Sequence, residues 1–447
     1  MRRKPHPFFC AKLRPADERI FPRLANDKIA DRLVGTPIYC TGAATLAACD
    51  ILHRQVRNKP SIATIYLGVG QVAAHAQAAC LSHPNDDNRS RDIHRRGRMK
   101  IAQVSPLMEA VPPKLYGGTE RIVSYIADEL AVMGHDVTLF ASGDSTTKAR
   151  LEAVWPRALR LDETMRDYLA PHLIMLQMVA ERASEFDIIH SHMDYLAFPI
   201  FRQTGVPFVT TLHGRLDLPE LGPLYNTFDD VPVVSISDAQ REPLPHANFI
   251  ATVHHGIPTR LLTPGSGAGG YLAFIGRISP EKAPDAAIRI AAASGMKLKI
   301  AAKVDAVDRE YFTTRIAPLL KEPNVEYIGE ISDAEKSAFL GNAAGLIFPI
   351  AWREPFGLAM IEAMACGTPV IALRRGSVPE VIDDGVTGFI VDDEAQAAAA
   401  ARRLHELDRI RVRHVFEVRF SVRRMTEDYL SIYRRLIARK HPLREAV

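Results

Sequence analysis

Residues 353–367, REPFGLAMIEAMACG, place two glutamates around the start of a predicted helix. Glu354 precedes the helix and Glu362 follows eight residues later, while a proline suits the helix start and a glycine its end. If the helix starts near Phe356, its free backbone N–H groups point the way Glu354 lies, and such a helix start favours a phosphate or a ring of sugar hydroxyls. Carboxylates more than about two turns apart can bind separate hydroxyl groups of one long ligand. Taken alone, each glutamate also fits an ordinary exposed helix acid.

A second group of polar residues, Gly276 to Lys282 (GRISPEK), follows a short apolar run that predicts a strand. Arg277 and Lys282 therefore leave a strand end and enter a helix, which is where a diphosphate would sit. An arginine can hold phosphate oxygens in a bidentate manner, whereas a lysine acts as a point charge. Seen alone, the same residues also fit a solvated loop with surface cations.

A pair of glycines, Gly117 and Gly118, joins an early strand to its helix in the sequence LYGGTE. Paired glycines let the backbone approach a ligand without a clash from Cβ. The pair is weak evidence by itself, and it is not the G-x-G-x-x-G fingerprint of dinucleotide-binding folds.

The elements that carry these residues alternate between short apolar runs and helical stripes. In the first half the pattern predicts a helix over 121–133 and strands over 100–105, 137–140, 188–190, 208–211 and 233–236. In the second half it predicts strands over 272–275, 298–301, 325–328, 346–348 and 370–373, with helices over 280–294 and near 309–320. Such alternation predicts parallel sheets covered by helices, which bind ligands beyond the carboxyl ends of their strands.

The glycine-rich residues 263–270 (TPGSGAGG) have no apolar period and predict a hinge between two αβ halves. The predicted domains are 99–262 and 271–415, with a helical segment over 416–447. Its core is an amphipathic helix at 425–438 that packs back on the body. Because pockets favour domain interfaces, we look for the chemistry in the cleft between the halves.

At this point the sequence from about residue 99 to about residue 438 resembles the retaining glycosyltransferases of family 4, the "glycosyl transferases group 1" superfamily. This family has the GT-B fold, in which two Rossmann-like domains with parallel sheets face each other across a cleft. The matching motifs are the double glycine, the GRISPEK stretch, the E-x7-E pair and the segments 211–214 (TLHG), 235–237 (SIS), 255–257 (HGI) and 376–380 (GSVPE).

The resemblance implies a role for each motif residue. Arg277 and Lys282, beside Gly276, would bind the donor's diphosphate and stabilise it as it leaves. Glu354 would contact hydroxyls of the donor sugar, and Glu362 would bind the ribose. Further contacts would come from the backbone amides of Phe356, Gly357 and Leu358, from the loop of Gly117 and Gly118, and from His213 near the reacting sugar. We expect structural roles for His190, His192, His254 and His255, with no metal set among them, and a packed side chain at Cys366.

The implied activity is transfer of a hexose-type sugar from a nucleotide-diphosphate sugar, with a UDP-sugar as the expected donor and with retention of configuration. The acceptor, a small molecule, a glycan or a lipid, cannot be read from the sequence. Two cations and a helix start can take the place of Mg²⁺, so we expect no metal and no bound cofactor. The alternatives are a UDP-sugar 2-epimerase and a non-catalytic sensor of sugar nucleotides.

The amino-acid composition limits the class of protein, its partners and its location. The chain has 447 residues with 24% charged and 47% hydrophobic residues, which is typical of a globular protein of two or three domains. The net charge of +4 argues against a nucleic-acid partner, and no secretory signal or clean apolar run of about 18 residues is evident. We therefore expect a cytoplasmic protein, with peripheral contact at the inner membrane surface as an alternative.

The first 98 residues differ from the rest of the chain. They contain 17 Lys and Arg against 8 Asp and Glu, a net charge of +9, so the remaining residues carry −5. Four of the five cysteines also lie there, with a spacing that matches no zinc pattern. We interpret this segment either as a poorly ordered basic appendage or as an over-extended translation start.

Overall fold

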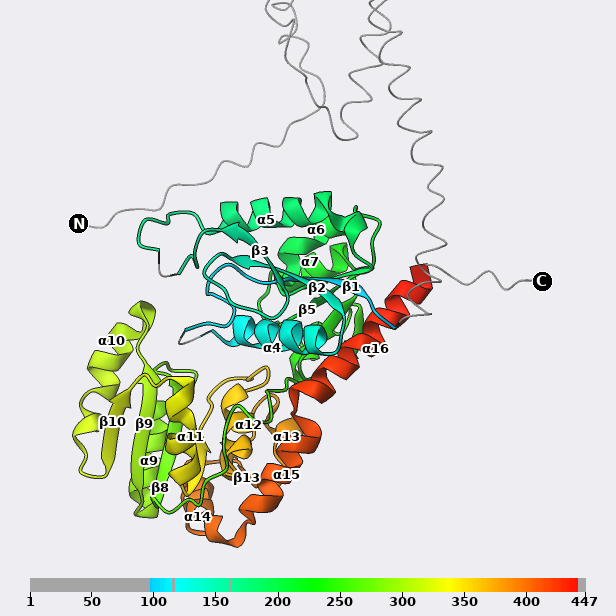
Figure 1. Cartoon of the computed structure of the whole chain (residues 1–447). Helices are drawn as coiled ribbons and strands as arrows, with labels where there is room; N and C mark the ends of the chain where they lie inside the picture. Colours follow the sequence, from blue (N-terminus) through cyan, green and yellow to red (C-terminus); the bar gives the residue numbers. More distant parts are fainter. Residues whose placement is uncertain (1–96, 115–116, 161, 441–447) are drawn as a thin grey trace, which may run out of the picture. The chain divides into compact units, whose positions relative to one another are not determined.

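The computed structural model describes residues 97–114, 117–160 and 162–440. The expectations for the basic N-terminal extension therefore lie almost wholly outside the described residues. Within the described part, the chain forms two sheets, one of seven and one of six strands, and every strand pairing is parallel. Helices flank both sheets (Figure 1), as the alternating pattern predicts.

The N-terminal sheet has the strand order β3-β2-β1-β4-β5-β6-β7. Its strands are β1 (Lys100–Val104), β2 (Asp136–Ser142), β3 (Arg150–Trp155), β4 (Ile188–Ser191), β5 (Phe208–Thr211), β6 (Val233–Ser235) and β7 (Phe249–Thr252). Its helices of at least four residues are α4 (Gly118–Val132), α5 (Leu169–Glu181), α6 (Phe198–Phe201), α7 (Leu221–Thr227) and α8 (Asp238–Arg241). The pattern missed β3 and β7, the two outermost strands of this sheet, which are only partly buried.

The C-terminal sheet repeats this order as β10-β9-β8-β11-β12-β13. Its strands are β8 (Tyr271–Arg277), β9 (Lys297–Lys303), β10 (Val325–Gly329), β11 (Gly345–Phe348), β12 (Val370–Leu373) and β13 (Gly388–Val391). Its helices of at least four residues are α9 (Pro284–Ser294), α11 (Asp333–Asn342), α12 (Leu358–Ala365), α13 (Val378–Val381) and α14 (Glu394–Arg402).

The pattern missed the edge strand β13, and two predicted helices of this half differ from the structure. The helix expected from residue 280 begins at Pro284, because the residues before it form a turn in which the amides of Lys282 and Ala283 both bond to the Ser279 carbonyl. The helix expected near 309–320 is broken into α10 (Arg309–Tyr311), a π-helical turn over Phe312–Ile316 and a 3₁₀ turn over Leu319–Lys321.

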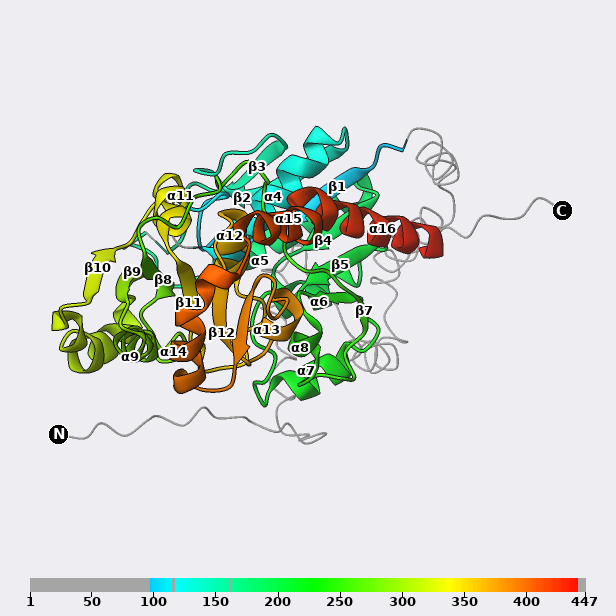
Figure 2. The same cartoon turned by 90° about the horizontal axis from the view of Figure 1, so that it is seen from below.

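The chain ends in α15 (Arg409–Arg419) and α16 (Val422–Lys440), and α16 contains the amphipathic helix expected at 425–438. Met425, Tyr429 and Tyr433 of α16 pack with Ile122 and Ile126 of α4 in the core of the N-terminal half. Figures 1 and 2 show α16 in red beside α4. The last helix therefore returns from the C-terminal half to cover the N-terminal sheet. Of the described helices, none is both long and apolar enough to cross a membrane.

In both sheets the strand order reverses direction at one point, between β1 and β4 and between β8 and β11. Open parallel sheets bind ligands beyond the carboxyl ends of the strands that flank such a point. Gly117 lies between β1 and α4, and Gly118 begins α4. Arg277 ends β8, while Glu354 follows β11. The fold therefore brings the predicted motifs to these two sheet edges.

Candidate active site

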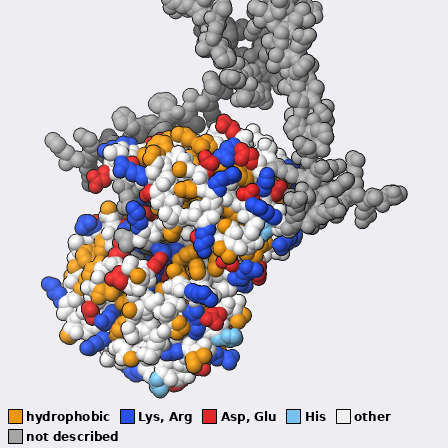
Figure 3. Space-filling view, viewed as in Figure 1, with side chains coloured by type: hydrophobic (Ala, Val, Ile, Leu, Met, Phe, Trp, Pro, Cys, Tyr) orange, Lys and Arg blue, Asp and Glu red, His pale blue; other side chains and the backbone are white. Residues whose placement is uncertain are grey.

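A cavity of about 610 Å³ is lined by residues from the carboxyl ends of both sheets. Charged side chains of both signs surround a hollow between the two halves in the space-filling view (Figure 3). The structure brings all the predicted site residues to the wall of this cavity: Gly117, Gly118, His213, Gly276, Arg277, Lys282, Glu354, Phe356, Gly357, Leu358 and Glu362. The guanidinium, the ammonium and the helix start that the sequence singled out thus converge on the same place.

Lys282 and Glu354 contact each other in this cavity. Lys282 Nζ lies 2.5 Å from Glu354 Oε2, and the indole N–H of Trp352 donates to the same oxygen at 2.8 Å. Both side chains are largely buried, so each charge depends on its partner for compensation. A bound diphosphate could replace Glu354 as the partner of Lys282, and sugar hydroxyls could replace Lys282 as the partners of Glu354. Neither charge would then be left unpaired.

The helix after Glu354 begins at Leu358 and not near Phe356, because Gly357 has a positive φ of 82° and ends the preceding loop. Leu358 and Ala359 of its first turn still line the cavity, and the first backbone amides of a helix have no partner within the helix. The loop is held from behind by Ser377, whose amide bonds to the Glu354 carbonyl at 3.0 Å and whose hydroxyl donates to the Phe356 carbonyl at 2.8 Å. The predicted GSVPE segment therefore acts as a support for the E-x7-E segment.

Arg277 is surrounded by acidic side chains. Its guanidinium lies 3.2 Å from Asp308, 3.7 Å from Glu281 and 3.8 Å from Asp305. Burial raises the pKa of Asp308, and the nearby Arg277 partly offsets this rise. The contacts with Glu281 and Asp305 are longer than a hydrogen bond, so these two carboxylates act on the guanidinium through charge alone.

Glu362 forms an ion pair that joins it to a chain of charges across the cavity. Lys336 Nζ lies 2.7 Å from Glu362 and 3.1 Å from Asp333, both in the C-terminal half. Asp333 in turn pairs with Arg121 of α4 in the N-terminal half. A ribose at Glu362 would therefore share that carboxylate with Lys336.

The N-terminal wall of the cavity contains a buried carboxyl group at Glu120, in the first turn of α4. Burial raises the pKa of Glu120 to about 7, although backbone hydrogen bonds and the Arg160 charge act in the opposite direction. Arg160 also lines the cavity and pairs with Glu109 at 3.1 Å. Gly117 at the start of this helix packs closely on Pro113, since a Cβ at Gly117 would lie 2.8 Å from Pro113 Cβ.

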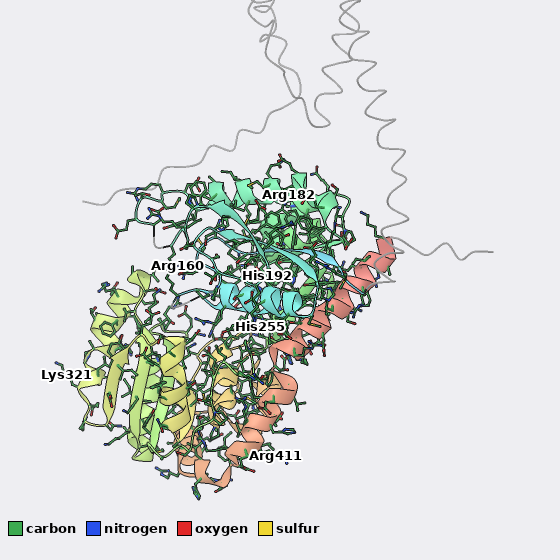
Figure 4. All side chains as sticks on the ribbon, in the orientation of Figure 1. Arg160, Arg182, His192, His255, Lys321 and Arg411 are labelled. Atoms are coloured by element: carbon green, nitrogen blue, oxygen red, sulfur yellow. The ribbon has the colours of Figure 1, made fainter. Side chains whose placement is uncertain are left out.

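His213 follows β5 and is held by neighbouring imidazoles. Its Nε2 lies 2.9 Å from His192 Nδ1, and its ring stacks on His255 with centroids 5.3 Å apart. Burial lowers the pKa of His213 to about 3, so the ring is uncharged at neutral pH. Asp194, whose backbone has a φ of 46°, lies next to the His213 amide, and burial raises its pKa to about 6. Figure 4 shows His192, His255 and Arg160 in the region where the two halves meet.

The remaining histidines that we expected to be structural have protein partners. His190 is fully buried and hydrogen-bonded to Tyr433 and Thr211, and His254 pairs with Glu380 at 3.1 Å. Among the described residues no cluster of three or more His, Cys, Asp or Glu side chains is arranged to hold a metal ion. Cys366 is fully buried at the end of α12, which confirms the prediction of a packed side chain.

Two family models match this chain, one for each half. The model of the Glycosyltransferase Family 4 matches residues 116–233, and the model of the Glycosyl transferases group 1 matches residues 267–413. The chain belongs to the family 4 glycosyltransferases and is a transferase enzyme with the GT-B fold, as the motifs predicted.

Curated relatives support this assignment over most of the described chain. The D-inositol 3-phosphate glycosyltransferase of Saccharomonospora viridis is 27% identical over 409 residues, covering 77% of this chain and 95% of that protein. The enzyme of the same name from Acidothermus cellulolyticus is 29% identical over 394 residues, covering 72% of this chain and 87% of that protein.

Solved structures share the fold. Sucrose-phosphate synthase from Thermosynechococcus elongatus superposes with a TM-score of 0.61 at 19% identity, covering 76% of this chain and all of that chain. Anabaena HepE in complex with UDP and glucose superposes with a TM-score of 0.59 at 18% identity, covering 75% of this chain and 99% of that chain.

Several cavity residues escaped the sequence analysis. Lys336 has Asp333 three residues earlier, which is the pattern of an ordinary surface ion pair on a helix. Glu120 and Arg121 follow the double glycine after Thr119, so proximity to that motif was the available signal. Trp352 is one of two tryptophans in the chain and lies two residues before Glu354, a position that could have marked it.

Proposed function

We propose that this chain transfers a sugar from a UDP-sugar to a hydroxyl group of an acceptor, with retention of the anomeric configuration. The solved relative named for its complex with UDP and glucose supports the choice of donor. The observation that carries the proposal is the convergence of Arg277, Lys282 and the start of α12 on the same cavity as His213 from the opposite sheet. Both matching family models describe glycosyltransferases, which favours transfer over the epimerase and the sensor.

In the proposed reaction the bond between the sugar's anomeric carbon and the diphosphate oxygen breaks, and negative charge grows on the leaving UDP. Arg277 and Lys282 would hold the diphosphate, together with the amides of Leu358 and Ala359. Fixed donors aimed at developing charge in a cavity from which water is largely excluded stabilise the transition state strongly. These groups supply the charge compensation that a magnesium ion provides in other transferases.

Acceptor activation would use the leaving group itself. The acceptor hydroxyl attacks from the same face that UDP leaves, its oxygen forms the new bond to the anomeric carbon, and its proton passes to an oxygen of the departing diphosphate. Glu354 would hold hydroxyls of the donor sugar, Glu362 would hold the ribose, and His213 would contact the reacting sugar. The loop of Gly117 and Gly118 would approach the phosphates from the N-terminal half.

The acceptor would bind against the N-terminal wall of the cavity. Glu120 and Arg160 present hydrogen-bonding groups of both polarities there, which suits an acceptor rich in hydroxyls. The curated relatives act on an inositol phosphate according to their names, so a phosphorylated cyclitol is the first acceptor to assay.

The test is a donor screen with the full chain and labelled UDP-, GDP- and ADP-sugars, with inositol phosphates and a cell extract as acceptors. We expect turnover with a UDP-sugar, the same rate in the presence of EDTA, and a product whose anomeric configuration matches the donor. A product epimerised at C2 would identify the epimerase instead. Tight UDP-sugar binding without turnover on any acceptor would identify the sensor.

A further inference from the structure

A buried chain of hydrogen bonds connects His213 in the cavity to the last helix of the protein. His213 Nε2 lies 2.9 Å from His192 Nδ1, and His192 Nε2 lies 2.9 Å from Gln103 Oε1. Gln103 Nε2 donates to Tyr433 Oη of α16 at 3.1 Å. Gln103, His192 and Tyr433 are each at most 2% exposed, so water does not compete for these contacts.

The chain of hydrogen bonds continues beyond Tyr433 to Thr211 at the end of β5. Tyr433 Oη lies 2.6 Å from His190 Nδ1, and His190 Nε2 lies 2.8 Å from Thr211 Oγ1. The hydroxyl of Tyr429 lies 3.0 Å from the same Thr211 oxygen. Burial lowers the pKa of both His190 and His192 well below the ordinary value, so each ring carries one proton at neutral pH.

Because each ring carries one proton, the donor and the acceptor of each hydrogen bond in this series can be assigned. The Gln103 amide directs its oxygen to His192 and its nitrogen to Tyr433, so Tyr433 accepts from Gln103 and donates its own proton to His190. Because the Gln103 oxygen can only accept, His192 carries its proton on Nε2 and presents a bare Nδ1 to His213. His213 must then donate from Nε2.

We propose that Tyr433 and Gln103 are positioning residues, which act through His192 to hold the proton of His213 on Nε2 and so leave Nδ1 as its hydrogen-bond acceptor. The inference rests on the proposed function, because it gives His213 a defined part in binding the reacting sugar. A neutral imidazole with a bare Nδ1 accepts from a sugar hydroxyl, whereas the other tautomer would direct an N–H at that group.

The arrangement makes the C-terminal helix part of the site, although α16 contributes no residue to the cavity wall. The stacking of His255 and the Asp194 carboxyl beside the His213 amide fix where the ring lies. The contacts of the Gln103 nitrogen, with Tyr433 Oη at 3.1 Å and with His190 Nδ1 at 3.4 Å, orient the amide and so determine which nitrogen of His213 is protonated. Helix α16 therefore has a chemical role in addition to its packing against α4.

The test compares two substitutions on the same helix. Tyr433→Phe removes the hydroxyl that orients Gln103, whereas the control Tyr429→Phe removes a buried hydroxyl that contacts only the far end of the chain at Thr211. We expect Tyr433→Phe to lower kcat about fivefold to tenfold with the donor KM within about twofold, since one buried hydrogen bond contributes roughly 1 kcal/mol. Tyr429→Phe should stay within about twofold of the wild type.

The tautomer is read directly from ¹⁵N spectra of the full chain with labelled histidine, in which His213 is assigned by its loss in His213→Gln. We expect a bare Nδ1 and a protonated Nε2 at His213 in the wild type and in Tyr429→Phe, and a mixture of tautomers in Tyr433→Phe. If Tyr433→Phe does not fold, Gln103→Met removes the same orientation from the other side.

Two results would overturn the inference about the His213 tautomer. A wild-type His213 protonated on Nδ1 overturns it, as does a Tyr433→Phe variant with unchanged tautomer and unchanged kcat. The spectra need no substrate, so they test the inference even if no donor is turned over. Failure of the donor screen would therefore count against the proposed function and leave the tautomer result to stand separately.

Discussion

At the scale of residues, each charged side chain that the reaction would use is paired with a group of opposite charge. Lys282 is joined to Glu354, Glu362 to Lys336, and Arg277 to three carboxylates. A partly buried charge without a partner is costly, so these cations and carboxylates compensate one another. A sugar nucleotide provides new partners for both signs at once.

Replacing Lys282 by Met tests the role of the ammonium group. We expect kcat to fall by about 10²-fold, because one fixed donor to the leaving group is lost, while the protein stays folded. The matched control is Lys321→Met, an exposed lysine at the outer edge of the C-terminal half (Figure 4), which should keep activity within about twofold. Near-wild-type turnover in Lys282→Met would remove this residue from the mechanism.

Glu120 allows a prediction about pH. Because burial raises its pKa from 4.5 to about 7, the folded protein keeps a proton that the unfolded chain releases between these values, so stability falls as pH rises through this window. Glu120→Gln cannot ionise, and its free energy of unfolding relative to wild type should rise by about 1–3 kcal/mol between pH 4.5 and 8.

Urea unfolding at the two pH values measures this difference. The substitution control is Glu181→Gln at the exposed end of α5. A Glu120→Gln variant whose advantage is equal at both pH values would show that the buried carboxyl does not titrate in this window.

At the scale of elements, the active-site loop depends on a glycine that does not line the cavity. Gly376 has a φ of 51°, and a Cβ there would lie 2.3 Å from the Glu354 carbonyl oxygen and 2.5 Å from the Glu354 nitrogen. Because both contacts are with backbone, the loop of Glu354 would have to move. The GSVPE segment of the family motif is thus explained by packing as well as by chemistry.

The variant Gly376→Ala should therefore lose activity although the residue touches no proposed ligand. We expect kcat to fall at least about tenfold, because displacement of Glu354 and of the α12 amides by even 1 Å is costly. Gly385→Ala is the matched control, since its φ of 74° imposes similar backbone strain but no atom lies within 4 Å of its Cβ position. Equal kcat losses in the two variants would attribute the effect to strain alone.

At the scale of the whole molecule, contacts between the two halves surround the cavity. Glu380 of α13 accepts the backbone amides of Asp238 and Ala239 at 2.7 Å each, at the start of α8 in the other half. Burial alone would raise the pKa of Glu380, but the hydrogen bonds from His254 and from these amides hold it below its ordinary value. Its contribution to stability is therefore present at neutral pH and is lost on acidification.

Glu380→Ala should destabilise the protein at pH 7 by about 1–3 kcal/mol, because two amides and one imidazole lose a charged acceptor. Urea unfolding provides the measurement, with Glu394→Ala as control. Glu394 pairs with Arg289 on the surface of the C-terminal half, and such exposed pairs contribute about 0–1 kcal/mol. A Glu380 variant no less stable than this control would contradict a role in joining the halves.

The sequence by itself determined the two parallel sheets and the residues gathered at their edges. Apolar runs and helical periods are local properties, and a motif that follows a strand must lie at the strand's carboxyl end. This reasoning was sufficient to bring Arg277, Lys282, Glu354 and His213 to the same cavity. It failed at weakly apolar outer strands such as β3, and at the start of α12, which Gly357 delays.

Only the tertiary structure decided which groups meet. Arg121 pairs with Asp333, and Gln103 bonds to Tyr433, across 212 and 330 residues of chain respectively. The glycines of residues 263–270 look like flexible linker residues in the sequence, yet Gly265 and Gly267 are hydrogen-bonded to the C-terminal half. Pairing, burial and pKa depend on atoms brought together from distant segments, and no local pattern records those distances.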